Sequence, residues 1–205
     1  MLSRRLLNKY TVKGRRSIRL KDYNYSWPGF YFVTICVKDK DCCLGKIVEY
    51  DNFLDGPTVI LTKLSEIVRD IWRSIPNHHP KTELDEFIIM PNHLHGIIII
   101  NDDYGRGDAC IAPTRFFEKQ PAGSLSTIVG SFKSEVSKRI HLLKEWKNFI
   151  WQRNYYEHII RDEISLEKIR NYIIDNPRKW YDDIENPNNK FNKKQVSDYY
   201  KNLFK

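Results

Sequence analysis

The stretch His93-Leu94-His95-Gly96-Ile97-Ile98-Ile99-Ile100 decides how the fold is interpreted. An uncharged segment that ends in four isoleucines is typical of a central strand buried on both faces. Side chains two residues apart in a strand point the same way, so His93 and His95 are expected on one face. Residues 83–90 (ELDEFIIM) and the turn at Pro91-Asn92 predict a neighbouring strand that pairs with it.

The segments on either side extend this pattern to an α+β order. Residues 30–37 (FYFVTICV) alternate and are rich in aromatic and β-branched side chains, which predicts a strand. A spacing near 3.6 predicts amphipathic helices over residues 62–75 and 124–146 and two shorter helices over 154–161 and 165–176. A further strand is expected over residues 42–50, and an irregular loop over 104–123. The order favours a ferredoxin-like sandwich, an antiparallel sheet with helices packed on it.

Length and charge suggest one full domain with two basic extensions. The chain has 205 residues with 34 basic and 26 acidic side chains, a net charge of +8. Eight of the basic residues and none of the acidic ones lie in residues 1–21, so this segment holds the whole excess. We expect a basic N-terminal arm (1–26), a catalytic domain (27–181) and a basic, helical C-terminal tail (182–205).

The arm suits a polyanion, because lysine and arginine release condensed counterions when they neutralise phosphates. A merely solvated start is the alternative. No apolar run approaches the length that crosses a bilayer, and four cysteines without a C-x-x-C spacing suggest reduced thiols. We therefore expect a cytoplasmic protein with no membrane partner; a mitochondrial presequence is the weaker reading of the first residues.

The histidine pair is the first candidate site. Two imidazoles on one face of a rigid strand are placed to share a cation, although an isolated H-x-H is more often incidental. Here two polar rings occupy an otherwise apolar strand, where burial without partners is costly. Imidazole ligands alone would also allow Zn²⁺ or Ni²⁺.

The second candidate is WQRNYYEHIIRD, residues 151–162. If Asn154 caps a helix, Tyr155 and His158 lie at i and i+3 on one face. A phenol beside an imidazole can be a nucleophile beside a metal ligand. The plainer alternative is a pair of half-buried tyrosines and a surface histidine.

Four blocks in this order resemble the REP-associated tyrosine transposases, relatives of the single-strand insertion-sequence transposases. The blocks are RRSIRLKDYNYSWPGFYFVTICV, MPNHLHGIII, SLSTIVGSFKSEVSKRI and WQRNYYEHIIRDEISLEKIRNYIIDNPRKW, and they span roughly residues 15 to 181. The resemblance implies a ferredoxin-like core that cuts and rejoins single-stranded or hairpin DNA through a 5′-phosphotyrosine, as a monomer or homodimer. A non-catalytic nucleic-acid-binding module, or a nuclease that activates water, are the alternatives.

The resemblance also implies roles for single residues. Tyr155 would be the nucleophile, His93 and His95 paired ligands of Mg²⁺ or Mn²⁺, and His158 the third ligand. The wider family often has a glutamine one turn after the tyrosine, where this chain has Ile159.

Smaller roles are expected for residues around these groups. Candidate DNA contacts are Arg15, Arg16, Arg19, Arg153 and Arg161, the last two being equally plausible as surface residues. Asn92, Gln152 and Glu157 could support the ligands, or be a turn residue and solvated side chains.

Overall fold

The computed structural model describes residues 23–49, 56–102, 123–192, 194–195 and 198–199. Its main sheet has four antiparallel strands in the order β4-β5-β1-β6. The strands are β1 (Gly29–Cys36), β4 (Thr82–Ile89), β5 (His93–Ile100) and β6 (Tyr156–Ile160). With the helices between them, they give the ferredoxin-like order, so the predicted α+β sandwich is confirmed.

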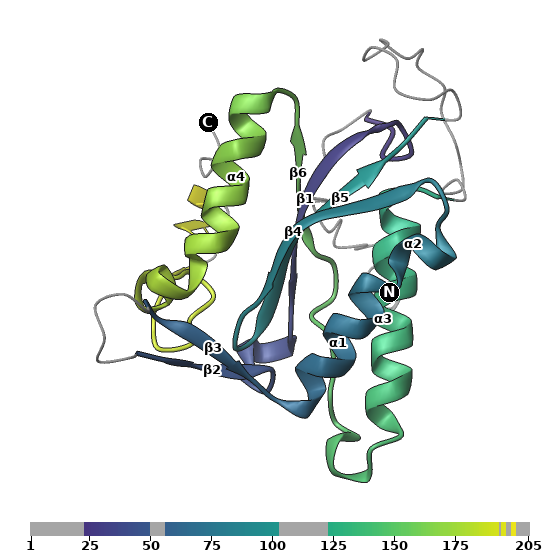
Figure 1. Cartoon of the computed structure of the whole chain (residues 1–205). Coiled ribbons are helices and arrows are strands. Elements are labelled where there is room, and N and C mark those ends of the chain that lie inside the picture. The colour runs from purple at the N-terminus through teal and green to yellow at the C-terminus, as the bar shows by residue number, and fades with distance from the viewer. Residues whose placement is uncertain (1–22, 50–55, 103–122, 193, 196–197, 200–205) are drawn as a thin grey trace, which may run out of the picture.

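The helices lie on both faces of this sheet (Figure 1). Helix α1 (Lys63–Arg73), the short α2 (Ile75–His78) and α3 (Leu125–His141) cover one face, and α4 (Glu163–Asp175) covers the other. Each long helix has a polar start: Ser124 accepts from the amide of Thr127, and Asp162 accepts from the amide of Ser165. None of the helices in the described ranges is long and apolar enough to span a membrane.

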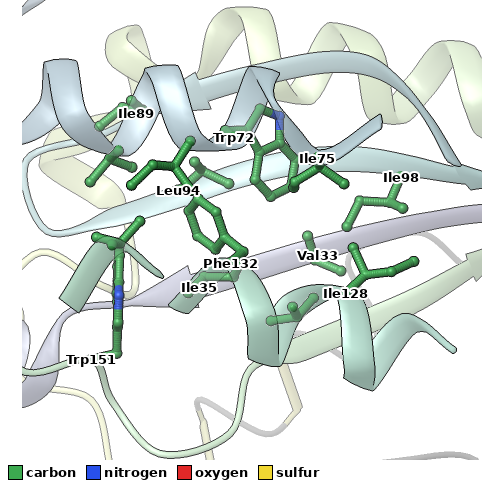
Figure 2. Packing of buried hydrophobic residues seen from close by; sticks show 14 of the residues in the cluster. Val33, Ile35, Trp72, Ile75, Ile89, Leu94, Ile98, Ile128, Phe132 and Trp151 are labelled. Atoms are coloured by element: carbon green, nitrogen blue, oxygen red, sulfur yellow. The ribbon is translucent and has the colours of Figure 1, made fainter. Parts of the chain in front are cut away.

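The larger part of the core lies between the sheet and the helices α1 and α3. Figure 2 shows Val33 and Leu94 from the central strands facing Trp72 of α1 and Phe132 of α3. The rings of Trp72 and Phe132 meet edge to face, with centroids 5.3 Å apart. A smaller cluster on the other face joins the sheet to Leu166, Ile169 and Ile173 of α4. The central strands β1 and β5 are therefore buried on both sides, which the sequence predicted for β5.

A two-stranded ribbon and three short turns complete the elements named in the described residues. A two-stranded ribbon pairs β2 (Gly45–Val48) with β3 (Thr58–Leu61). Short 3-10 turns are η1 (Lys38–Lys40), η2 (Lys144–Trp146) and η3 (Asn176–Asp182). The last of them directly continues α4 and brings residues 183–186 into buried positions.

The predicted helix over residues 154–161 is wrong, because this segment forms the edge strand β6. Phe30 of β1 pairs with Ile160, and Thr34 pairs with Tyr156. Asn154 has a φ of 69°, a left-handed conformation that does not begin a helix. The edge of β1 that does not face β5 pairs with this short segment, whose aromatic and β-branched residues suit a strand.

Other boundaries moved less. The helix expected over 124–146 ends at His141, and the helix expected over 62–75 ends at Arg73 and is followed by α2. The strand expected over 42–50 is shortened to β2. Residues 1–22 of the arm expected over 1–26, and nearly all of the loop expected over 104–123, lie outside the described residues.

Candidate metal and tyrosine site

His93 and His95 lie side by side on the α4 face of the central strand β5. Their side chains are 0% and 1% exposed, and their Nε2 atoms are 3.0 Å apart. In the sheet, Cys36 is the partner of His93 and Thr34 is the partner of His95. The sequence thus placed both rings on one face correctly, and two ring nitrogens converge on one point.

Hydrogen bonds to the far side of each ring hold this arrangement. Nδ1 of His93 lies 2.8 Å from Oδ1 of Asn92, and Nδ1 of His95 lies 2.9 Å from Oγ1 of Thr34. The Asn92 Nδ2 donates to two backbone carbonyls, so its Oδ1 accepts and Nδ1 of His93 carries the proton. This leaves the lone pair on Nε2 of His93, which is the tautomer that a metal ligand requires.

Burial keeps both rings neutral. It lowers the pKa of His93 to about 4. The negative charge of Glu185 raises this pKa, but by less than burial lowers it. Burial, and then the neighbouring His93, lower the pKa of His95 well below its usual value. Each neutral imidazole therefore keeps one ring nitrogen with a lone pair at neutral pH, as metal ligation demands.

A carboxylate that the sequence did not single out joins the pair. The ligand atoms of His93, His95 and Asp183 all lie within 4.8 Å of one another. Asp183 is buried, and burial raises its pKa to about 6. These three side chains form the one group of potential metal ligands among the residues that the structure describes.

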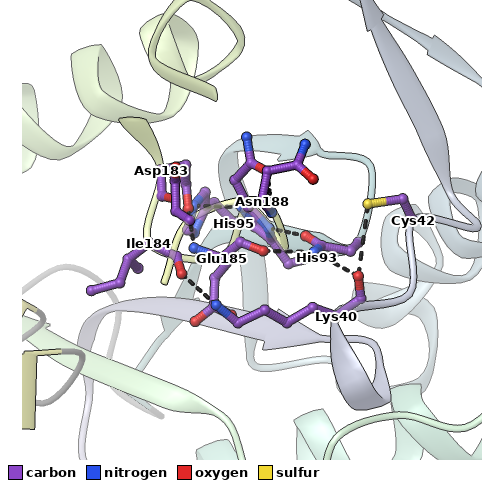
Figure 3. A network of polar contacts seen from close by, with 11 residues as sticks. Lys40, Cys42, His93, His95, Asp183, Ile184, Glu185 and Asn188 are labelled. Atoms are coloured by element: carbon purple, nitrogen blue, oxygen red, sulfur yellow. Dashed lines mark hydrogen bonds and ion pairs between the residues drawn. The ribbon is translucent and has the colours of Figure 1, made fainter. Parts of the chain in front are cut away.

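Lys40 and Asn92 hold the segment that carries Asp183 against the histidines, and Figure 3 shows Lys40 beside Ile184 and Glu185. Nζ of Lys40 donates to the carbonyl of Ile184 at 2.5 Å and lies 3.9 Å from the carboxylate of Glu185. Asn92 donates to the carbonyl of Glu185 at 2.8 Å. Residues 183–185, expected to belong to a separate tail, are thereby part of the site.

Tyr172 on α4 faces the histidines. Its hydroxyl lies 3.5 Å from Nε2 of His95 and 3.3 Å from the hydroxyl of Tyr199. Burial, followed by the neighbouring Tyr199 and Asp183, raises the pKa of Tyr172 above its usual value. The side-chain amide of Asn176 is buried without a hydrogen bond of good geometry, yet it is near enough to lower this pKa slightly.

The other two tyrosines lie further from the pair. Tyr155 precedes β6 and packs against the core cluster on the α1 and α3 face, so the sheet separates it from the histidines. Tyr156 lies on the histidine face, in one row with Thr34 and His95. That row places it on β6, two strands from β5, or roughly 10 Å at the usual strand spacing.

His158 does not join the ligand cluster. It pairs with Phe32 on the edge strand β6, and its pKa is lowered by burial and by Arg161. Its place beside His93 and His95 is taken by Asp183.

The remaining expected site residues are spread around the sheet. Gln152, Arg153 and Arg161 are exposed, and Glu157 is buried. Asn92 is buried beside His93, in the ligand-supporting position considered for it. Arg15, Arg16 and Arg19 lie outside the described residues.

Sequence comparisons relate the chain to a family of transposases. The profile of the family described as "Transposase IS200 like" matches residues 115–176, which include α3, β6 and α4. A Haemophilus influenzae protein described only as uncharacterized is 43% identical over 178 residues, covering 84% of this chain and 93% of that protein. A second Haemophilus influenzae protein, named as a REP-associated tyrosine transposase, is 25% identical over 158 residues, covering 76% of this chain and 74% of that protein.

The chain is also similar to a solved structure of a REP-associated tyrosine transposase bound to a REP hairpin. The two are 18% identical with a TM-score of 0.48, covering 78% of this chain and 72% of that one. The family match over residues 115–176 and the named relative support a tyrosine DNA transposase similar to the IS200-like family.

Proposed function

We propose that this transposase cleaves and rejoins single-stranded DNA at a divalent cation held by His93, His95 and Asp183, with Tyr172 as the nucleophile. The observation that carries the proposal is the 3.5 Å between the Tyr172 hydroxyl and Nε2 of His95. Tyr155, the tyrosine that the sequence favoured, packs on the opposite face. A nucleophile must approach the same phosphate that the ligands approach, and Tyr172 meets this condition.

The donor set fits a divalent cation. Two neutral imidazole nitrogens 3.0 Å apart and one carboxylate converge in a buried site. The Asn92 contact fixes the ligating tautomer of His93, a support that metal-binding histidines usually have. Mg²⁺ or Mn²⁺ is proposed, and the two nitrogen ligands favour Mn²⁺ of this pair. Once bound, such a cation would withdraw charge from a phosphate oxygen and stabilise the charge that develops during cleavage.

The chemistry of Tyr172 follows from its surroundings. Because its pKa is raised, the phenol is protonated at neutral pH and attacks only as its proton leaves. Attack forms a bond between the phenol oxygen and phosphorus and breaks the bond from phosphorus to the 3′ oxygen. The net result is a 5′-phosphotyrosine and a free 3′-hydroxyl, which carries the proton. Since no water is consumed, a 3′-hydroxyl can reverse the step and join strands.

The proposed substrate is repeat DNA that exposes a single strand or a hairpin. The relative named as a REP-associated transposase supports repeats of this kind. The concentration of the excess positive charge in residues 1–21 supports a polyanionic partner.

The test is covalent trapping on DNA. The full chain is incubated with end-labelled single-stranded repeats from its own genome and Mn²⁺ or Mg²⁺, and adducts that survive denaturation are digested and mapped by peptide mass. We expect the label on Tyr172, loss of the adduct in Tyr172→Phe, and its retention in the matched variant Tyr155→Phe. An adduct on Tyr155 or Tyr156 contradicts the assignment, and cleavage without any adduct identifies a nuclease that uses water.

A further inference from the structure

We infer that the ion pair between Arg170 and Asp85 positions Tyr172, by fixing how far α4 is rotated about its own axis. This inference rests on the proposed function, because it concerns the nucleophile proposed there. Arg170 and Asp85 are positioning residues, since neither touches the histidines in the described contacts. No motif in the sequence connects them.

The pair is well formed and partly buried. Nη2 of Arg170 donates to Oδ2 of Asp85 at 2.6 Å, and its Nε lies 3.2 Å from both carboxylate oxygens. The side chains are 31% and 13% exposed, so solvent screens the pair less than a surface contact. Arg170 also approaches Glu163 at 3.8 Å and Glu167 at 3.6 Å, but these carboxylates are largely exposed and add little orientation.

An irregularity in β4 aims Asp85 at the helix. The pairing of β4 with β5 shifts between Leu84 and Phe87, so that both of these side chains pack on the α1 and α3 side. The extra residue of such a bulge redirects the side chains beside it. Asp85 is thereby presented on the α4 side, at the edge of the sheet opposite β6.

Arg170 and Tyr172 lie on opposite flanks of α4. At about 100° per residue, they project about 160° apart around the helix, on either side of the apolar stripe formed by Leu166, Ile169 and Ile173. Apolar packing has no strong direction, so this stripe holds the helix on the sheet without fixing its rotation. The ion pair of Arg170 with Asp85, on one flank of the helix, is directional and therefore fixes the rotation.

The effect of rotation on the hydroxyl is large. A tyrosine hydroxyl lies several ångströms beyond the backbone cylinder, so a rotation of ~10° moves it by roughly 1.5 Å. A displacement near 1 Å can cost about a hundredfold in rate when reacting groups must be aligned. The Asp85 contact thus controls the distance between Tyr172 and His95.

The test measures the rate of adduct formation on saturating end-labelled single-stranded repeat DNA, in Mn²⁺ and well below the melting temperature. We expect Asp85→Asn and Arg170→Gln each to slow the reaction by roughly 10- to 100-fold, while the DNA dissociation constant changes by less than about twofold. The exchanged pair Asp85→Arg with Arg170→Asp should recover most of the rate. The control is Glu135→Gln, which removes the partner of Arg139 on α3 in an ion pair of similar length, 2.7 Å, and should leave the rate unchanged.

The results separate this inference from the function it rests on. Wild-type rates in both single variants would overturn the inference. It would also fail if the rates fell only in proportion to a loss of DNA affinity, or if the exchanged pair reacted no faster than the single variants. In each of these cases Tyr172→Phe would still abolish the adduct. If the wild-type chain forms no adduct, or Tyr172→Phe keeps it, the proposed function fails instead.

Discussion

The Tyr172 hydroxyl lies 3.5 Å from Nε2 of His95, although 77 residues separate them in the chain. Helix α4 leaves the edge strand β6, crosses the face of the sheet and contacts β4 at the opposite edge. The proposed nucleophile and the proposed ligands therefore meet within a single chain.

Mixing two inactive variants tests whether one chain suffices. We expect an equimolar mixture of Tyr172→Phe and His95→Ala to form no adduct on single-stranded repeat DNA, because each chain lacks one half of its own site. The measurement is the denaturation-resistant label, with wild type diluted by Tyr172→Phe as the control. Recovery of the adduct in the mixture would show that tyrosines are exchanged between chains.

Asp183→Asn should weaken Mn²⁺ binding by roughly tenfold or more, because the site loses its charged ligand. Asparagine keeps the oxygen that accepts from the amide of Glu185, so the local loop is preserved. His158→Gln is the matched variant and should bind Mn²⁺ as wild type does, since His158 lies on the edge strand. Titration calorimetry gives both affinities, and the reverse order would restore His158 as the third ligand.

Asn92→Ala should lower Mn²⁺ affinity by about 10- to 100-fold without removing a ligand, because His93 loses the contact that fixes its tautomer. Asn101→Ala is the control: Asn101 follows the other end of β5 and bonds to Glu83. Equal Mn²⁺ affinities in the two variants would mean that Asn92 stabilises only the turn before β5 and does not affect His93.

The strands and helices that could be predicted from sequence are those with long, regular patterns. The apolar run of β5 allows only a central strand, and its period places His93 and His95 together. The segment over 154–161 has five strand residues and an apolar spacing that also suits a helix. Whether this segment forms a strand or a helix depends on the edge of β1, with which it pairs in the structure. No local sequence pattern reveals that pairing.

The rest of the site depends on contacts distant in sequence. Tyr172 lies in an ordinary amphipathic helix, and a tyrosine beside an apolar stripe usually belongs to the core. Asp183 follows that helix in a segment whose charges indicate a solvated tail. The turn η3 and the contacts of Lys40 and Asn92 bring it back to the histidines.

The apo-protein should lose stability as the pH falls from about 6.5 toward about 4. Burial lowers the pKa of His93 to about 4, so in this range the unfolded chain binds a proton that the folded chain does not. Because of His93, the free energy of unfolding is expected to fall by on the order of 3 kcal/mol between pH 6.5 and about pH 4, and above pH 6.5 this loss is absent. Asp183, whose pKa is raised to about 6, acts in the opposite direction below that pH.

Urea unfolding with a chelator, at steps between pH 7.5 and 4.5, isolates the histidine contribution when wild type is compared with His93→Gln. The variant should show a flatter dependence on pH. Parallel curves for the two proteins would mean that His93 is not held neutral by the fold.

Gly96→Ala should destabilise the protein by about 1–3 kcal/mol, because the close packing on the back of the histidine strand leaves no room for a methyl group. A Cβ at Gly96 would overlap Cζ2 of Trp72 and lie 3.1 Å from Cβ of Phe87. Both neighbours are large rings, and Trp72 is completely buried, so neither can withdraw without opening the core. The control is Gly130→Ala on α3, where a Cβ meets nothing within 4 Å and a helix interior gains about 0.5–1 kcal/mol from alanine. Urea unfolding at pH 7.5 should therefore shift the two midpoints in opposite directions. A neutral Gly96→Ala would contradict the close approach of α1 to β5, on which the placement of His95 depends.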